Sequence, residues 1–103
     1  MLASQAQVII DQNGIIRVSG DLNFSSVMPV YNKAQELFRL HEKIKIDLEA
    51  VSRSDSAGLA LLVEWYRDVK AMNKSFSLQN MPEQLMKIAE MANLDDWIKQ
   101  WIN

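Results

Sequence analysis

A cluster of hydroxyl and carboxylate side chains occupies residues 52–56, where the sequence reads Ser-Arg-Ser-Asp-Ser. Such side chains bond to nearby backbone groups and therefore favour turns and helix N-caps. Asp55 and Ser56 come just before an apolar pattern with helical spacing, so we expect them at a helix N-terminus. The unpaired N–H groups of a first helical turn stabilise a carboxylate and also an incoming anion. Two interpretations stay open: a structural N-cap, or a recognition or phospho-acceptor loop.

The segments on either side of this cluster have the periods of regular structure. Residues 44–49 alternate apolar and polar side chains, which is typical of a strand with one buried face. The alternation breaks after Val51, so we expect a polar loop there. From Gly58 onward apolar residues recur every three or four positions, at Leu59, Leu62, Val63, Tyr66 and Val69. The predicted unit is strand, polar loop and helix.

The rest of the chain predicts one sheet with helices against it. Two β-rich runs, 8–10 and 15–18, flank an Asn-Gly pair and predict a hairpin. A helical pattern follows, with a core face at Val27, Val30, Tyr31, Ala34, Leu37 and Phe38. Residues 75–79 alternate like a strand, and Pro82 introduces another helix that Asn93 is expected to end. The element order is β, β, α, β, α, β, α, an α/β arrangement.

Two groups of large apolar residues remain after the core is assigned. Leu61, Trp65 and Met72 lie on one flank of the central helix, beside its predicted core face. Either Trp65 packs under the C-terminal segment, or this flank forms a partner-binding strip that continues the Asp55 loop. Trp97 and Trp101 are four residues apart, on one side of a helical turn. They either cover the open end of the core or dock onto another protein.

Composition excludes several classes of function. The 103 residues are enough for a single domain, here residues 1–103, and 11 basic against 13 acidic side chains disfavour nucleic acid as a partner. There is no cysteine, and the single His41 cannot build a histidine-rich metal centre. The N-terminus lacks a signal-peptide pattern, and no apolar run is long enough to span a bilayer. We expect a cytoplasmic protein without cofactor or metal.

An enzyme is the weakest of the interpretations. The only histidine follows a predicted helix end, and neither a Gly-x-Ser-x-Gly elbow nor a phosphate-binding loop is present. The carboxylates of Asp11, Asp21, Asp47 and Glu49 are scattered, and we expect them to be solvated or to cap turns. We therefore predict no catalytic residues.

The central unit resembles the STAS domain, named for sulfate transporters and anti-sigma-factor antagonists. Residues 46–51, Ile-Asp-Leu-Glu-Ala-Val, followed by residues 55–59, Asp-Ser-Ala-Gly-Leu, resemble the family's strand, loop and helix motif. Residues 51–62 are also similar to the corresponding region of the small STAS subunits of Mla-type phospholipid ABC transporters. The resemblance covers nearly the whole chain. It implies a STAS fold, with a single mixed β-sheet of about four strands and helices packed against it.

The resemblance also implies a function. The chain would be a non-catalytic subunit that binds and supports the transporter's ATPase, in a complex that also contains permease and substrate-binding subunits. It would serve phospholipid transport and outer-membrane lipid asymmetry, and it would reach the inner membrane only through that complex. The partner-binding residues would be Asp55, Ser56, Ala57, Gly58, Leu61, Trp65 and Met72. An exposed Trp65 would also favour a homodimer of the isolated chain.

The second function that the resemblance implies is signalling. In anti-sigma-factor antagonists the phosphorylated serine directly precedes the glycine of the motif, and here that position is Ala57. Ser56 carries the other hydroxyl of the motif, so phosphorylation would have to use Ser56. The alternative is therefore an antagonist-like switch regulated by phosphorylation of Ser56.

Overall fold

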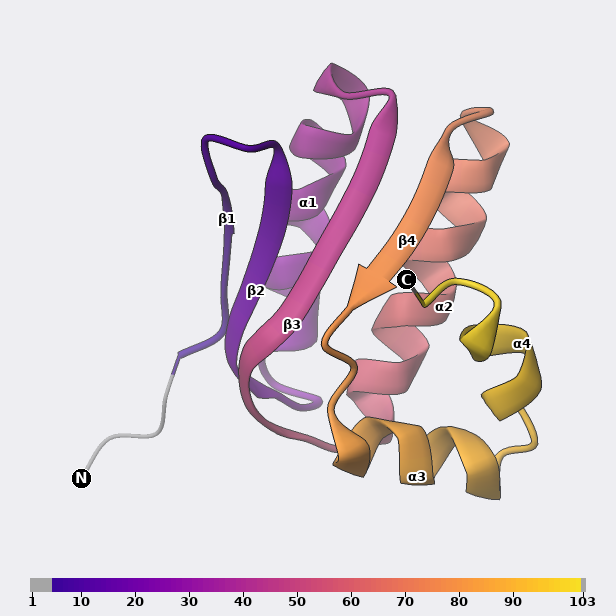
Figure 1. Ribbon diagram of the computed structural model, residues 1–103. Coiled ribbons are helices and arrows are strands. Elements are labelled where there is room, and N and C mark those ends of the chain that lie inside the picture. Colours follow the sequence, from indigo (N-terminus) through magenta and orange to yellow (C-terminus); the bar gives the residue numbers. More distant parts are fainter. Residues whose placement is uncertain (1–4, 103) are drawn as a thin grey trace.

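The computed structural model describes residues 5–102. In chain order the elements are β1 (Gln7–Ile10), β2 (Ile15–Leu22), α1 (Val27–Leu40), β3 (Lys43–Ser54), α2 (Ser56–Ala71), β4 (Ser75–Gln79), α3 (Glu83–Met91) and α4 (Asp95–Lys99). The strands form one sheet in the order β1-β2-β3-β4, in which β1 is antiparallel to β2 and the other two pairs are parallel (Figure 1). The predicted mixed sheet with packed helices is confirmed.

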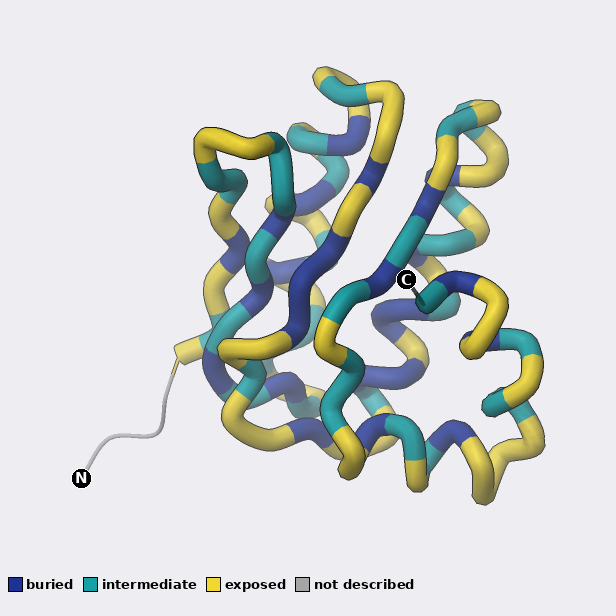
Figure 2. The backbone as a smooth tube through the Cα atoms, in the orientation of Figure 1, coloured by how far each residue is buried: buried dark blue, intermediate teal, exposed yellow. Residues whose placement is uncertain are grey.

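The helices cover one face of the sheet and leave the other open. In Figure 1 both α1 and α2 lie behind the strands. Burial alternates along the whole of β2 and over residues 43–46 of β3 (Figure 2), because successive strand side chains point to opposite faces. Ile16, Val18, Ile46 and Leu48 are buried on the helix-covered face. The core therefore lies between the sheet and the α1–α2 layer.

The N-terminal hairpin forms as predicted. Residues Gln7–Ile10 pair with Ile16–Ser19, and Gly14 takes a φ of 79° in the turn. The Asp11 carboxylate accepts hydrogen bonds from the N–H groups of Asn13 at 2.8 Å and Ile15 at 3.0 Å. Asp11 thus caps a turn, as its sequence context indicates.

β3 is longer than the sequence pattern indicates, and the expected loop after Val51 is wrong. The strand continues to Ser54 because β2 runs alongside it to the end, with Asp21 opposite Arg53 and Leu22 opposite Ser54. Two register shifts accommodate this extension, one of them after Gly20. Gly20 has a φ of 86°, and a Cβ there would lie 2.1 Å from the Gln5 carbonyl oxygen. The polar side chains of residues 52–54 therefore belong to a strand end.

The C-terminal segment closes the core beside β4, and this part of the prediction is confirmed. Asn93, at a φ of 59°, separates α3 from α4. Trp101 is buried and stacks on Tyr66 with 4.2 Å between ring centroids, and Trp97 meets both rings edge-on. The Leu78 N–H donates to the Trp101 carbonyl at 2.8 Å, so the chain end also covers the outer edge of β4.

Candidate partner-binding site at the start of α2

Asp55 is the N-cap of α2. Its carboxylate accepts a hydrogen bond from the Ala57 N–H at 2.8 Å, and its own N–H donates to the Leu22 carbonyl at 3.1 Å. The structural N-cap interpretation is therefore confirmed for Asp55. The Ser56 side chain is exposed and Ala57 is half-buried, so both lie at the surface of the first turn. The same turn is thus both anchored and accessible.

Gly58 allows this first turn to pack closely against the sheet. It is buried, and a Cβ at this position would lie 1.9 Å from the Ser54 hydroxyl oxygen and 3.3 Å from the Leu22 Cβ. Ser54 is itself buried, and its N–H donates to the Gln84 side-chain oxygen at 3.1 Å. Only a glycine lets α2 start this close to the ends of β2 and β3.

An apolar groove opens beside the first turn, between α1 and α2. We call it the α1–α2 groove. It has a volume of about 420 Å³ and is lined by Phe24, Val27, Met28 and Tyr31 on one side and by Ala57, Ala60, Leu61 and Glu64 on the other. Phe24 is 88% exposed and Met28 is 58% exposed. Exposed apolar side chains next to a groove are typical of a protein-binding surface.

A hydrogen-bond cluster holds the two walls of the groove together. The Tyr31 hydroxyl on α1 donates to the Asp68 carboxylate on α2, and the Gln35 side-chain amide donates to the same oxygen at 2.9 Å. The bond to Asp68 and burial favour the neutral phenol, and together they raise the pKa of Tyr31 to about 12. The spacing of α1 and α2 is thus fixed by polar contacts as well as by packing.

The prediction that Leu61, Trp65 and Met72 form an exposed strip is wrong. Trp65 is fully buried and meets Phe38 of α1 edge-on, with 5.8 Å between ring centroids. Leu61 is buried at the base of the groove, and half-buried Met72 follows the far end of α2. The wide apolar arc of α2 has a structural reason, because this helix packs against both the sheet and α1. The alternative, Trp65 beneath the C-terminal segment, is also wrong, since Tyr66 takes that place.

The structure brings Ala57, next to Asp55 and Ser56 in the chain, together with two groove residues that the sequence pattern did not single out. Phe24 lies in a polar turn, and Met28 is off the predicted core face of α1. Neither residue therefore belongs to the set of apolar residues that recur at helical spacing. A large apolar residue in a turn whose neighbours are Asn23 and Ser25 was the available signal.

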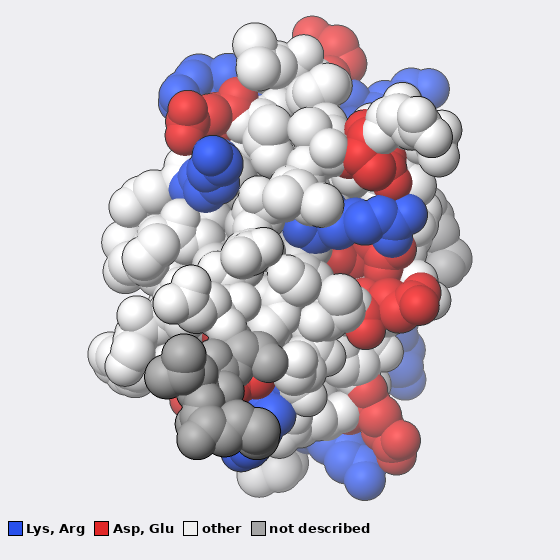
Figure 3. Space-filling model, turned by 90° about the vertical axis from the view of Figure 1, so that its left-hand side faces the viewer, with Lys and Arg blue, Asp and Glu red and all other residues white. Residues whose placement is uncertain are grey.

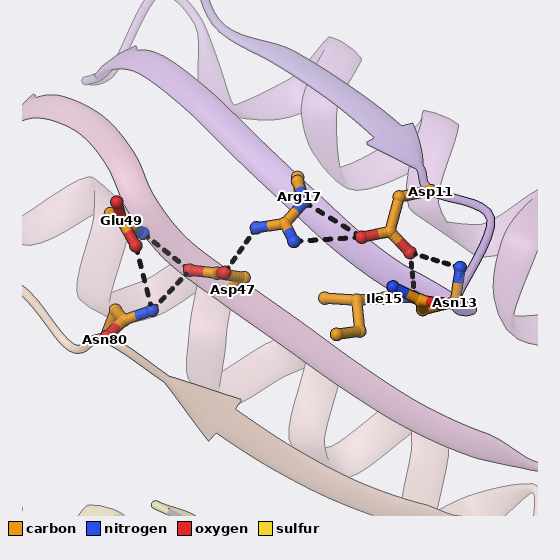
Figure 4. A network of polar contacts seen from close by, with 7 residues as sticks. All are labelled: Asp11, Asn13, Ile15, Arg17, Asp47, Glu49 and Asn80. Atoms are coloured by element: carbon orange, nitrogen blue, oxygen red, sulfur yellow. Dashed lines mark hydrogen bonds and ion pairs between the residues drawn. The ribbon is translucent and has the colours of Figure 1, made fainter.

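The open face of the sheet carries a polar network that is separate from the groove. Arg17 donates to the carboxylates of both Asp11 and Asp47, and Asn80 donates to Asp47 at 3.1 Å and to Glu49 at 3.3 Å (Figure 4). Asp47 is only 4% exposed, which corrects the expectation that it is solvated. Its place beside Arg17 on the neighbouring strand explains how a carboxylate can be buried there.

The ionisation of Asp47 is stabilised by its neighbours. Burial opposes its negative charge, but hydrogen bonds from the Glu49 N–H and Asn80, together with the charge of Arg17, outweigh burial and lower the pKa of Asp47. His41 lies elsewhere, at the C-cap of α1. Within residues 5–102, no three His, Cys, Asp or Glu side chains are grouped so as to hold a metal ion. The network has the features of a structural ion pair.

Comparison with known proteins identifies the family. The family model described as Mlab, STAS domain matches residues 6–100. The chain belongs to the STAS domain family. This assignment agrees with the motif at residues 46–59 and with the observed sheet, and the predicted STAS fold is confirmed.

Two curated STAS relatives lie at similar distances from this chain. The intermembrane phospholipid transport system binding protein MlaB of Haemophilus influenzae is 29% identical over 87 residues, which cover 81% of this chain and 83% of that protein. The anti-sigma-B factor antagonist of Bacillus subtilis is 28% identical over 83 residues, covering 81% and 76%.

The fold of this STAS domain is also found in a solved structure. The Bacillus cell fate determinant SpoIIAA in its phosphorylated form aligns with a TM-score of 0.68 and 19% identity, over 95% of this chain and 88% of that one. No helix within residues 5–102 of this STAS domain has the length and apolar character needed to cross a bilayer.

Proposed function

We propose that this STAS domain is a non-catalytic subunit that binds and supports the ATPase of an Mla-type phospholipid ABC transporter. The observation that carries the proposal is the accessible first turn of α2 beside an apolar groove with Phe24 at its rim. Similarity to MlaB of Haemophilus influenzae supports the choice of a phospholipid transport system. In this account the chain is cytoplasmic and meets the inner membrane through the transporter, which contributes to outer-membrane lipid asymmetry.

The binding surface in this proposal combines residues from both sides of the groove. Asp55, Ser56, Ala57 and Gly58 form the first turn of α2, and Phe24 and Met28 add the exposed apolar area that Trp65 does not supply. Leu61 acts from the base of the groove, where it shapes the surface. Met72 follows the opposite end of α2, so a contact there requires a partner that extends along the helix.

An affinity pull-down from native membranes tests the proposal. The tagged chain is recovered in mild detergent, and the proteins that accompany it are identified by mass spectrometry. Recovery of an ABC ATPase with its permease and substrate-binding subunits is the expected result. Recovery of a serine kinase or a sigma-regulatory protein without an ABC ATPase would contradict it.

A signalling role is the second candidate, and the similarity to the anti-sigma-B factor antagonist favours it. The exposed Ser56 hydroxyl at the α2 N-terminus is the group that would accept a phosphate, because Ala57 has none. A phosphate would place a charge of about −1.5 to −2 beside the apolar groove and change which partner can dock. Intact-mass spectrometry of the chain isolated from its native cell, before and after phosphatase treatment, tests this role. An unmodified mass under all growth conditions would exclude it.

A further inference from the structure

Within the described residues 5–102, no strand pairs with the outer edge of β1, in contrast to the other edge of the sheet. β1 is the terminal strand of the sheet and pairs only with β2 among residues 5–102, whereas β4 is covered by Trp101 and Ile102. The strand reads Gln-Val-Ile-Ile and contains none of the Lys, Pro or bulge features that usually protect a sheet edge. An edge of this kind favours pairing with another strand.

The surroundings of this edge are mainly apolar, and Lys33 is the one charged residue that lines the groove beside β1. Ile9 is 58% exposed, and a groove of about 340 Å³ separates β1 from Pro29, Val30 and Lys33 of α1. Figure 3 shows this side of the molecule with a broad uncharged centre, and the acidic and basic side chains gather mainly toward its borders. β1 itself carries no charged side chain, so two β1 strands can pair without placing like charges directly opposite each other.

The hydrogen-bond alternation of the hairpin determines which backbone groups face outward. The Asp11 N–H donates to the Ile15 carbonyl at 2.9 Å, so Asp11 and Ile15 form a hydrogen-bonded pair. The pairs Ile9–Arg17 and Gln7–Ser19 lie two and four positions further along the same ladder. In an antiparallel pair, bonded and non-bonded residue pairs alternate. Gln7 and Ile9 therefore bond inward to β2, and the N–H and C=O groups of Val8 and Ile10 point to the open edge.

These outward groups are self-complementary. We infer that β1 pairs in antiparallel fashion with β1 of a second copy, Val8 opposite Ile10 and Ile10 opposite Val8, to form a continuous sheet across a two-fold axis. This register makes about four backbone hydrogen bonds and brings the two Ile9 side chains together on the open face. The β1 edge pairs with a second copy of the chain because the same apolar segment supplies both halves of the contact.

The inferred dimer is distinct from the proposed ATPase contact. The groove beside β1 is lined on α1 by Pro29, Val30 and Lys33, whereas the α1–α2 groove is lined by Val27, Met28 and Tyr31 with α2. A four-residue strand gives a small contact area, so the dimer is weak and depends on concentration. The homodimer expected from an exposed Trp65 loses its basis, because Trp65 is buried. The inferred dimer uses the β1 edge instead.

Sedimentation velocity over a range of concentrations tests the association. We expect the wild-type chain to shift from monomer to dimer as its concentration rises, and Ile9→Lys to weaken dimerisation at least tenfold. Met91→Lys is the matched control, because Met91 is 85% exposed on α3, and it should leave dimerisation unchanged. Thermal melting verifies that each variant folds. A wild-type chain that stays monomeric at all concentrations, or a dimer unaffected by Ile9→Lys, would overturn the inference.

Cysteine cross-linking tests the register, since the chain contains no cysteine of its own. Two Ile9 residues in a non-hydrogen-bonded pair have Cα atoms about 4.5 Å apart, which is within the range of a disulfide. Ile9→Cys should therefore give a disulfide-linked dimer on oxidation. Gln7→Cys places its two thiols four strand positions apart, about 14 Å, and should not. Equal cross-linking of both variants, or efficient cross-linking of Ser56→Cys instead, would overturn the proposed pairing.

Discussion

Gly58 lies so close to Ser54 that a Cβ on the glycine would come within 1.9 Å of the serine hydroxyl oxygen. This contact joins the first turn of α2 to the end of β3. The Ser54 hydroxyl donates to the Asp55 carbonyl at 3.0 Å, so the serine also binds the residue that caps the helix. The position of the candidate site therefore depends on the close approach of the α2 backbone at Gly58 to the Ser54 and Leu22 side chains.

Gly58→Ala tests this approach. The added methyl group must displace the Ser54 hydroxyl and press on Leu22, and overpacking of this kind costs about 1–3 kcal/mol. Urea unfolding measures the loss. Ser54→Ala removes the oxygen that the methyl group meets, so the double variant should lose less than the sum of the single losses. Strictly additive losses would show that the two residues do not compete for this space.

The ion pair of Asp47 predicts a pH dependence of stability. The pKa of Asp47 is below its ordinary value in the folded chain, so ionised Asp47 stabilises the fold above pH ~4, and this contribution is lost as the pH falls further. Asp47→Asn should lower the free energy of unfolding by about 1.5–3 kcal/mol at pH 7. The difference in the free energy of unfolding between Asp47→Asn and wild type should become smaller below pH ~4. Exposed Glu36→Gln is the control and should show no such loss at pH 7.

The Tyr31 hydroxyl predicts a second pH dependence, with the opposite sign. The pKa of Tyr31 is raised to about 12, so the bond to Asp68 stabilises the fold below pH 10 and is lost as the pH rises toward 12. Tyr31→Phe should cost about 1 kcal/mol at pH 7. Chemical unfolding measures the free energy of unfolding of wild type and Tyr31→Phe, and the difference between these two values should become smaller above pH 10. A difference that is constant from pH 7 to pH 11 would contradict the bond to Asp68.

The aromatic cluster predicts unequal roles for the two C-terminal tryptophans. Trp101 is 3% exposed and stacks on Tyr66, so Trp101→Ala should cost about 3–5 kcal/mol in the free energy of unfolding. Trp97 is only half-buried, and Trp97→Ala should cost clearly less. Thermal unfolding followed by circular dichroism compares the two variants. Equal losses would argue against Trp101 as the main cover of the core at β4.

Much of the fold could be predicted because local periods agree with the tertiary structure. The hairpin, the core face of α1 and the strand at residues 75–79 each follow from patterns within a few residues. The end of β3 could not be predicted in this way. Its polar residues 52–54 stay in the strand because β2 pairs with them, and a pairing between distant segments leaves no local signal.

The candidate site was only partly predictable for a related reason. The Asp55 cap is a local interaction and followed from residue type and position. The burial of Trp65 depends on Phe38, which lies on a different helix, so counting angles around α2 could not reveal it. Phe24 was missed because exposure of an apolar residue is decided by what the rest of the chain leaves uncovered.

Recovery of the ATPase by two matched variants tests the central claim most directly. Phe24 and Met91 are 88% and 85% exposed, so Phe24→Glu and Met91→Glu each add one charge at an exposed apolar residue. Phe24 lines the α1–α2 groove, whereas Met91 lies at the end of α3. Both tagged variants and the wild type are used to recover the ABC ATPase from native membranes. The account predicts that Phe24→Glu reduces recovery at least tenfold and that Met91→Glu matches wild type. Full recovery with Phe24→Glu would contradict it.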